Sequence, residues 1–220
     1  RDLGETWAAC LGEADIEFGV HEFGGECSQA SIDAGVAAAR AARATTVIGV
    51  GGGKTLDTSR AVAAAIGAAT VNCPTLASSD APCSALSVVA VALKKIDRLQ
   101  FYPRNPDLVL VDTTLVAAAP RRYLVSGMGD ALATWYEART VIEAHRPTQV
   151  GGATTLSAAA LAELCCRTLY ADGAAAAAAV DAGVVTPALE RIVEANTLLS
   201  GLGFESGGLA VAHSVHNGLT

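Results

Sequence analysis

Short apolar runs and alanine-rich stretches of helical spacing alternate along the first half of the chain. The clearest run, Thr45–Val50, is dominated by β-branched residues, which is typical of a buried strand. Since strands that alternate with helices form parallel sheets covered on both faces, the pattern predicts an α/β fold with a parallel sheet. The predicted strands are Ile16–Phe23, Thr45–Val50, Ala69–Cys73 and Asp107–Val111, and the predicted helices are Ser28–Ala44 and Thr55–Ile66.

From about Leu115 onward the strand signal disappears and helical patterns take over. The change of pattern near Val111–Pro120 is the best candidate for a domain boundary. It predicts an α/β domain over residues 1–115 and an all-α domain over residues 116–220, and a cleft between two such domains is a favoured place for ligands. The predicted helices are Pro120–Glu143, Thr154–Tyr170, Ala174–Ala182 and Pro187–Leu199, the last with a proline in its first turn.

Composition and charge narrow the classes of function. The chain has 220 residues, of which 51% are hydrophobic, and it contains no run of eighteen apolar residues, so we expect no membrane span. The first residues, Arg1–Glu5, have no signal-peptide core. A net charge of −7 with 15 scattered basic residues disfavours a nucleic-acid partner. The six cysteines form no CxxC pair, which indicates reduced thiols and a cytoplasmic protein.

Three consecutive glycines follow the Thr45–Val50 run, in the segment Gly51-Gly52-Gly53-Lys54-Thr55. Glycines let the backbone approach a phosphate, and a helix N-terminus supplies free N–H groups and the positive end of a dipole. The P-loop motif fails because Ile48 occupies its first glycine position, and GxGxxG fails because its last glycine falls on Lys54. The segment therefore predicts a phosphate-binding turn of neither type, with a tight turn that binds no ligand as the alternative.

A second loop follows the next predicted strand and carries several hydroxyl groups and one carboxylate, Asp80. Ligands of open α/β sheets bind at the carboxyl ends of the strands, where this loop begins. Asp80 is either a ligand contact or a helix N-cap.

Two histidines and one aspartate are candidates for a metal site. His213 and His216 share a face at helical spacing, among apolar neighbours. They are either packed core residues or groups that bind a metal or transfer a proton. Asp130 lies in an otherwise apolar helical stretch, where a carboxylate is costly unless it is paired or bound to a cation. A metal held by Asp130 and His213 would explain both.

Together these segments resemble the zinc-dependent glycerol dehydrogenases, a branch of the iron-containing (group III) alcohol dehydrogenase family. The resemblance implies that residues 1–115 bind NAD and that residues 116–220 form a helical metal-binding domain. It further implies oxidation of glycerol or a similar small vicinal diol to the hydroxyketone, with NAD and Zn²⁺ as cofactors, by a cytoplasmic homo-oligomer. The matching segments are Gly51–Asp57, Thr75–Ser87, Asp107–Asp112, Gly127–Arg139, Val185–Asn196 and Gly203–Thr220.

The resemblance also implies roles for single residues. Asp130 and His213 match two zinc ligands, and Asp80 matches the residue that hydrogen-bonds glycerol, so it is expected to be both substrate-binding and catalytic. His216 is a candidate catalytic residue as a proton relay. The positions that match NAD contacts are Gly52, Gly53, Lys54, Thr55, Leu56, Asp57, Thr75, Leu76, Ala77, Ser78, Ser84 and Leu86.

The chain departs from the family pattern at several positions. Thr134 stands where iron-dependent relatives carry another histidine ligand, which favours zinc. Ala90 replaces a tyrosine that contacts the cofactor, and Ser59-Arg60 replaces an Ala-Lys pair whose lysine lies near the nicotinamide ribose. The segment Val89–Lys95 is unlike the family and is expected to form an altered hairpin.

The resemblance implies that the chain is a fragment. The family's first strand would precede Arg1, and its third zinc ligand, a histidine, would follow Thr220. Two alternatives stay open. One is an enzyme like dehydroquinate synthase, although sparse Lys and Arg argue against its phosphorylated substrate. The other is a truncated, catalytically inactive product that still folds.

Overall fold

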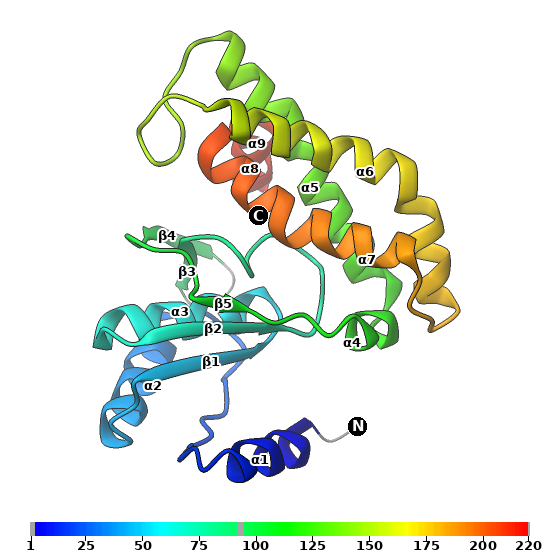
Figure 1. The fold of residues 1–220 in the computed structure, drawn as a ribbon. Helices are drawn as coiled ribbons and strands as arrows, with labels where there is room; N and C mark the ends of the chain where they lie inside the picture. Colours follow the sequence, from blue (N-terminus) through cyan, green and yellow to red (C-terminus); the bar gives the residue numbers. More distant parts are fainter. Residues whose placement is uncertain (1–2, 92–94, 220) are drawn as a thin grey trace.

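The structure is a computed structural model that describes residues 3–91 and 95–219. Its first part contains a three-stranded parallel sheet in the order β1-β2-β5 (Figure 1). Strand β1 (Thr46–Gly51) pairs along its whole length with β2 (Ala69–Pro74), and β2 pairs with the short β5 (Leu108–Val109). The predicted α/β fold with a parallel sheet is confirmed, and so are three of its strands.

Helices α2 (Gln29–Ala41) and α3 (Gly53–Ile66) lie on one side of this sheet. The Oγ of Ser28 accepts a hydrogen bond from the N–H of Ser31 and so caps α2. A Cβ atom built on Gly35 would lie 2.7 Å from Cγ2 of Val62, so the two helices approach closely at this glycine. Both predicted helices are confirmed, and α3 begins at Gly53 rather than Thr55.

The opposite face of the sheet is partly open. Ile48 and Leu108 flank Val71 in the strand register, and they are 38% and 52% exposed. The expectation that helices cover both faces is therefore wrong for the part of the chain that the structure describes, because α2 packs on α3 rather than across the sheet.

The predicted strand Ile16–Phe23 is also wrong. A helix that was not predicted, α1 (Leu3–Glu13), precedes the segment, and residues 16–23 form neither helix nor strand. Phe18 is 48% exposed and Val20 is 87% exposed. An alternating pattern makes a strand only where a neighbouring strand accepts its hydrogen bonds and a core covers its apolar face.

A two-stranded antiparallel hairpin follows the loop after β2. It consists of β3 (Leu86–Val91) and β4 (Lys95–Phe101), with an irregular register between Val89 and Ala90. The hairpin predicted around Val89–Lys95 is present, and residues 92–94 at its turn lie outside the described residues.

The second part is helical, as predicted, and none of the described helices is both long and apolar enough to cross a membrane. The division into two domains at residue 115 stays a prediction. The helices are α4 (Thr113–Ala118), α5 (Arg121–Glu143), α6 (Leu156–Asp181), α7 (Pro187–Glu194), the π-helical turn η1 (Ala195–Leu199), α8 (Ser200–Gly207) and α9 (Val211–Leu219).

Two predicted helix ends are wrong. Helix α6 runs unbroken through the gap predicted between Tyr170 and Ala174. Gly173 does not end the helix, because it is buried where a Cβ would lie 3.1 Å from Sδ of Met128 on α5, so this glycine serves close helix packing. The helix that begins at Pro187 does not end at Leu199 but continues through η1 into α8.

The two parts meet at the loop that follows β2. Ala77 from this loop is 1% exposed and belongs to the apolar core of the helical part. Asn196 on η1, which is fully buried, donates hydrogen bonds to the carbonyl oxygen of Ala77 at 2.9 Å and to that of Leu124 on α5 at 3.2 Å. One buried amide therefore joins the loop to two helices.

Two glycines of α5 provide a matched test of this contact. A Cβ on Gly127 would lie 2.1 Å from the carbonyl oxygen of Ala77 and 2.5 Å from Nδ2 of Asn196, whereas a Cβ on Gly129 meets nothing within 4 Å. We expect Gly127→Ala to lower the free energy of unfolding by about 2–3 kcal/mol. Gly129→Ala should raise it by about 0.5–1 kcal/mol, the ordinary helix effect. Urea denaturation measures both, and equal effects would contradict the close contact.

Candidate functional site

The triple glycine forms the turn between β1 and α3, as the sequence predicts. Gly51 has φ +154°, and a Cβ there would lie 2.6 Å from Oγ1 of Thr55. Gly52 is the N-cap of α3 and has no side chain to bond the first helical N–H groups. Lys54 is exposed and pairs with Glu26 at 2.6 Å. The turn thus presents an open helix N-terminus with an exposed cation beside it, an arrangement typical of phosphate binding.

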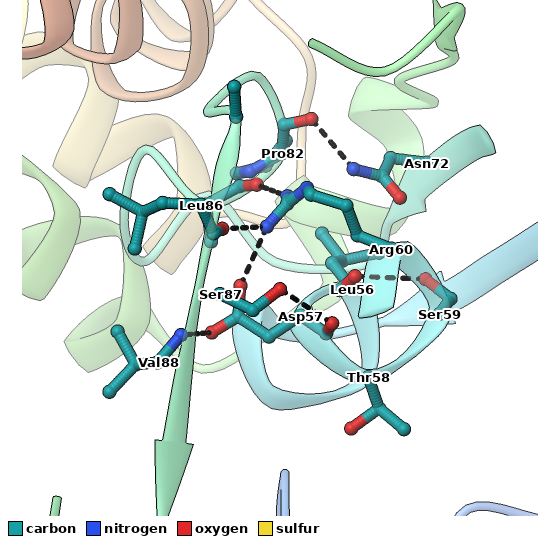
Figure 2. Close-up of polar contacts among 12 residues, drawn as sticks. Leu56, Asp57, Thr58, Ser59, Arg60, Asn72, Pro82, Leu86, Ser87 and Val88 are labelled. Carbon is teal, nitrogen blue, oxygen red and sulfur yellow. Dashed lines mark hydrogen bonds and ion pairs between the residues drawn. The ribbon is translucent and has the colours of Figure 1, made fainter. Parts of the chain in front are cut away.

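Asp57 and Arg60, one turn further along α3, form a buried ion pair at 2.9 Å (Figure 2). Burial raises the pKa of Asp57 to about 6, although the Arg60 guanidinium and the N–H of Val88 lower it. Arg60 also donates to the carbonyl oxygens of Leu86 and Ala81. The guanidinium is 2% exposed and points into the protein. Arg60 therefore holds β3 and the loop before it against α3.

Most of the remaining residues that were predicted to contact NAD lie in the loop between β2 and β3, whereas Leu56 lies in α3 and Leu86 begins β3. Thr75 donates its N–H to the carbonyl oxygen of Gly51 at 3.0 Å, which joins this loop to the glycine turn. A Cβ on Gly53 would lie 3.4 Å from Oγ of Ser79, so the two loops lie side by side. Thr75, Leu76, Ser78 and Leu86 are partly exposed, and Leu56, Ala77 and Ser84 are buried.

Asp80 lies where this loop meets the helical part. Its N–H donates to Oδ2 of Asp130 at 3.3 Å, and its own Oδ2 accepts from Oγ of Ser200 at 2.8 Å. The Ser200 hydroxyl lies 2.9 Å from that of Thr134, and both residues are buried. The N-cap alternative for Asp80 is wrong, because residues 81–83 form a turn and the next element is β3. Removal from water, followed by repulsion from Asp130, raises the pKa of Asp80 well above its ordinary value.

Asp130 on α5 and His213 on α9 face one another. The Nε2 atom of His213 lies 3.6 Å from Oδ1 of Asp130, and each side chain is 28% exposed. The carboxylates of Asp130 and Glu137 raise the pKa of His213 to about 10, against the opposing effect of its partial burial. The structure therefore brings together Asp80, Asp130 and His213 from a loop and two helices. The side chain of His216 lies outside the described residues.

Glu137 is a site residue that the sequence reasoning missed. Its side chain is 3% exposed and contacts Nδ1 of His213 through Oε2. Burial raises its pKa, but the hydrogen bonds from His213 and from two backbone N–H groups outweigh this, and the net pKa is lowered. The signal was present in the sequence, since Glu137 lies seven residues after Asp130, which is two helical turns on the same face. Ser200 was also missed, and no local pattern marks it.

The residues present fit the cofactors that the family resemblance implies. Carboxylate and imidazole suit zinc and iron alike, and a cation beside Asp130 would offset its repulsion of Asp80. Within the part of the chain that the structure describes, no group of three His, Cys, Asp or Glu side chains is arranged to hold a metal, and Asp130 and His213 are two candidate ligands. For NAD, the open N-terminus of α3, which lies between the glycine turn and the loop that follows β2, fits a pyrophosphate.

The buried ion pair can be tested by removing its cation. Arg60→Met leaves the Asp57 carboxylate and two carbonyl groups without their donor, so we expect a loss of about 3–5 kcal/mol in the free energy of unfolding. The control is Arg121→Met, which breaks an exposed 2.8 Å pair with Asp181 and should cost about 0–1 kcal/mol. Urea denaturation compares them, and similar losses would contradict a structural role of Arg60.

The raised pKa of His213 predicts a pH dependence in metal-free protein. The folded-state pKa of about 10 lies above the ordinary 6.5, so charged His213 stabilises the fold fully below about pH 6.5. This contribution is lost as the pH rises toward 10. Urea denaturation in EDTA should show a steeper fall for the wild type than for Asp130→Asn over this window. A control, Glu143→Gln, changes a carboxylate of α5 that is 71% exposed and should follow the wild type. Identical slopes for all three proteins would refute the assignment.

Comparisons with known proteins identify the family of the chain. Residues 2–113 match the family of iron-containing alcohol dehydrogenases. A glycerol dehydrogenase from Thermotoga maritima is 55% identical over 99% of this chain and 59% of its own length. One from Escherichia coli is 53% identical over 94% of this chain and 57% of its own length. The solved structure of glycerol dehydrogenase from Schizosaccharomyces pombe superimposes with a TM-score of 0.91 at 40% identity, over 97% of this chain and 54% of that one.

The chain thus spans somewhat more than half the length of the relatives it matches. The matched family profile covers the sheet, the glycine turn and the Asp80 loop up to the start of the helical part. The curated relatives extend the match across the helices that carry Asp130 and His213. This chain belongs to the iron-containing alcohol dehydrogenase family.

Proposed function

We propose that this chain carries the NAD-binding and metal-binding parts of an enzyme that oxidises glycerol, or a similar small vicinal diol, to the hydroxyketone. The observation that carries the proposal is the contact between Asp80 and Asp130 at 3.3 Å. It brings the loop beside the glycine turn against the helix that offers a metal ligand. A phosphate-binding turn, a substrate carboxylate and two metal-binding groups thereby line one site.

NAD would lie along the glycine turn and the adjacent loop. The open N-terminus of α3 and the exposed Lys54 offer donors for the pyrophosphate. Thr75, Leu76 and Ser78 are partly exposed and extend the binding surface toward Asp80. Buried residues such as Leu56 and Asp57 would support this surface from beneath. NAD⁺ accepts the hydride from the carbon that is oxidised, and the protein supplies binding and orientation.

Asp130 and His213 would hold the metal, for which we propose Zn²⁺. When bound, the metal lowers the pKa of a substrate hydroxyl by acting as a Lewis acid. Thr134, at the position of the additional histidine ligand in iron-dependent enzymes, is 1% exposed and bonded to Ser200, so it offers no ligand. This supports zinc over iron.

Asp80 would bind the second hydroxyl of the diol. Ser200 donates to Oδ2 of Asp80, whereas Oδ1 accepts no hydrogen bond from the described residues and would accept one from substrate. We retain His216 as the proposed proton relay toward solvent. The same proposal includes a cytoplasmic homo-oligomer and a domain boundary near residue 115. The six cysteines are free thiols, five of them buried, which supports a reducing compartment.

The test is reduction of NAD⁺ by glycerol with added Zn²⁺. It compares this chain with a version extended at both ends by the flanking segments of the Thermotoga maritima relative. We expect the extended protein to form NADH and hydroxyketone, and Asp130→Asn to abolish turnover and zinc binding while NADH binding persists. Glu143→Gln, an exposed carboxylate on the same helix, should change neither.

Full turnover by Asp130→Asn would refute the metal assignment. NADH binding that is unaffected by Gly53→Val, which adds bulk 3.4 Å from Ser79, would refute the cofactor assignment. A requirement for phosphate in ligand binding would favour the dehydroquinate-synthase alternative.

A further inference from the structure

His213 lies between two carboxylates of the same helix. Asp130 and Glu137 are seven residues apart on α5, and two helical turns place them on one face. The imidazole offers one ring nitrogen to each of them. Nε2 lies 3.6 Å from Oδ1 of Asp130, and Nδ1 contacts Oε2 of Glu137 within hydrogen-bond distance. The two nitrogens therefore have different partners, and the ring has one defined orientation.

The two oxygens of Glu137 have separate tasks. Oε1 accepts the backbone N–H groups of Ala210, at 2.8 Å, and of His213, at 3.1 Å. These groups lie at the start of α9 (Val211–Leu219), where helical N–H groups have no partner within the helix. Oε2 faces the ring of His213. An ionised carboxylate only accepts hydrogen bonds, so Nδ1 of His213 must be the donor.

We propose that Glu137 is the positioning residue of the metal site: it keeps the proton of His213 on Nδ1 and so presents Nε2 to a metal held with Asp130. This inference rests on the proposed metal-binding role of Asp130 and His213. Histidine ligands commonly donate their second nitrogen to a carboxylate, and loss of such a partner typically weakens metal binding 10- to 100-fold.

Glu137 accepts three hydrogen bonds, from the N–H groups of Ala210 and His213 and from Nδ1 of His213. A glutamine at this position has only one acceptor oxygen. In Glu137→Gln the single amide oxygen can keep both N–H groups of α9, so the helix remains capped. The amide NH₂ then points at Nδ1 and donates to it, which moves the ring proton to Nε2 and blocks the metal-binding nitrogen. A residue that merely caps α9 would tolerate this change.

The experiment compares wild type, Glu137→Gln and the control Glu143→Gln in the protein extended at both ends by the flanking segments of the Thermotoga maritima relative. NMR of ¹⁵N-histidine-labelled protein reports which ring nitrogen of His213 carries a proton, without metal and after addition of Zn²⁺. Competition with a chromogenic chelator reports zinc affinity, and amide exchange of α9 reports its folding. We expect wild type and Glu143→Gln to keep the Nδ1 proton when Zn²⁺ is bound. Glu137→Gln should lose the Nδ1 proton and bind Zn²⁺ at least about 10-fold more weakly, with α9 still protected.

Zinc affinity of Glu137→Gln equal to that of wild type would overturn the inference and leave the metal site standing. Zinc bound at Nδ1 of wild-type His213 would overturn it even if the variant does not fold. Absence of zinc binding by both wild type and Glu143→Gln would overturn the proposed metal site and this role of Glu137 with it.

Discussion

The loop between β2 and β3 is held by side chains that donate hydrogen bonds to its backbone carbonyl groups, and the candidate site depends on this anchoring. Each donor comes from a different element of the structure, so the loop is fastened from several directions. A buried carbonyl left without a donor costs about 1–3 kcal/mol, which makes any other loop conformation expensive. The donors and the carbonyls they hold are Asn196 with Ala77, Arg60 with Ala81, Asn72 with Pro82, and Asn105 with Cys83.

Because Asp80 lies within this anchored loop, its carboxylate is held against Asp130 and Ser200 before any ligand arrives. The same fastening keeps like charges together, since Asp130 and Glu205 both oppose ionisation of Asp80. A cation bound beside these carboxylates would offset this repulsion. The position of Asp80 and the rise of its pKa are thus two consequences of one anchored loop.

The parts of the fold that depend on local signals could be predicted from the sequence. A segment of a few residues is enough to predict the β-branched run of β1, the glycine turn and the alanine-rich helices. The prediction of a strand at Ile16–Phe23 was wrong because a strand needs a neighbouring strand to accept its hydrogen bonds. A local sequence pattern does not show whether such a neighbour exists. The gap predicted between Tyr170 and Ala174 is wrong, because Gly173 packs closely on Met128, which is remote in sequence.

Some residues of the candidate site could likewise be predicted from local sequence, and others could not. Asp130 could be singled out as a carboxylate in an apolar helix, and a shared metal was a reason to pair it with His213. The approach of Asp80 came from the family resemblance, since Asp80 is distant in sequence from both. Arg60 was noticed only as a departure from the family. Its actual partners, two carbonyl groups and Asp57, are visible only in three dimensions. The hydroxyl groups of Thr134 and Ser200 form a hydrogen bond between two helices. No local sequence pattern predicts this contact.

The π-helical turn η1 changes the direction in which side chains face along the continuous helix formed by α7, η1 and α8. An α-helix turns about 100° per residue, so the extra residue of a π turn rotates everything after it relative to what precedes it. Before η1, Leu189 and Ile192 are buried in the core. Within η1, Asn196 donates a hydrogen bond to Ala77, and directly after η1, Ser200 donates one to Asp80. An insertion or deletion of one residue between Pro187 and Ser200 would leave the helix intact but turn the loop-facing side chains away. The spacing of this segment is therefore constrained more tightly than its composition.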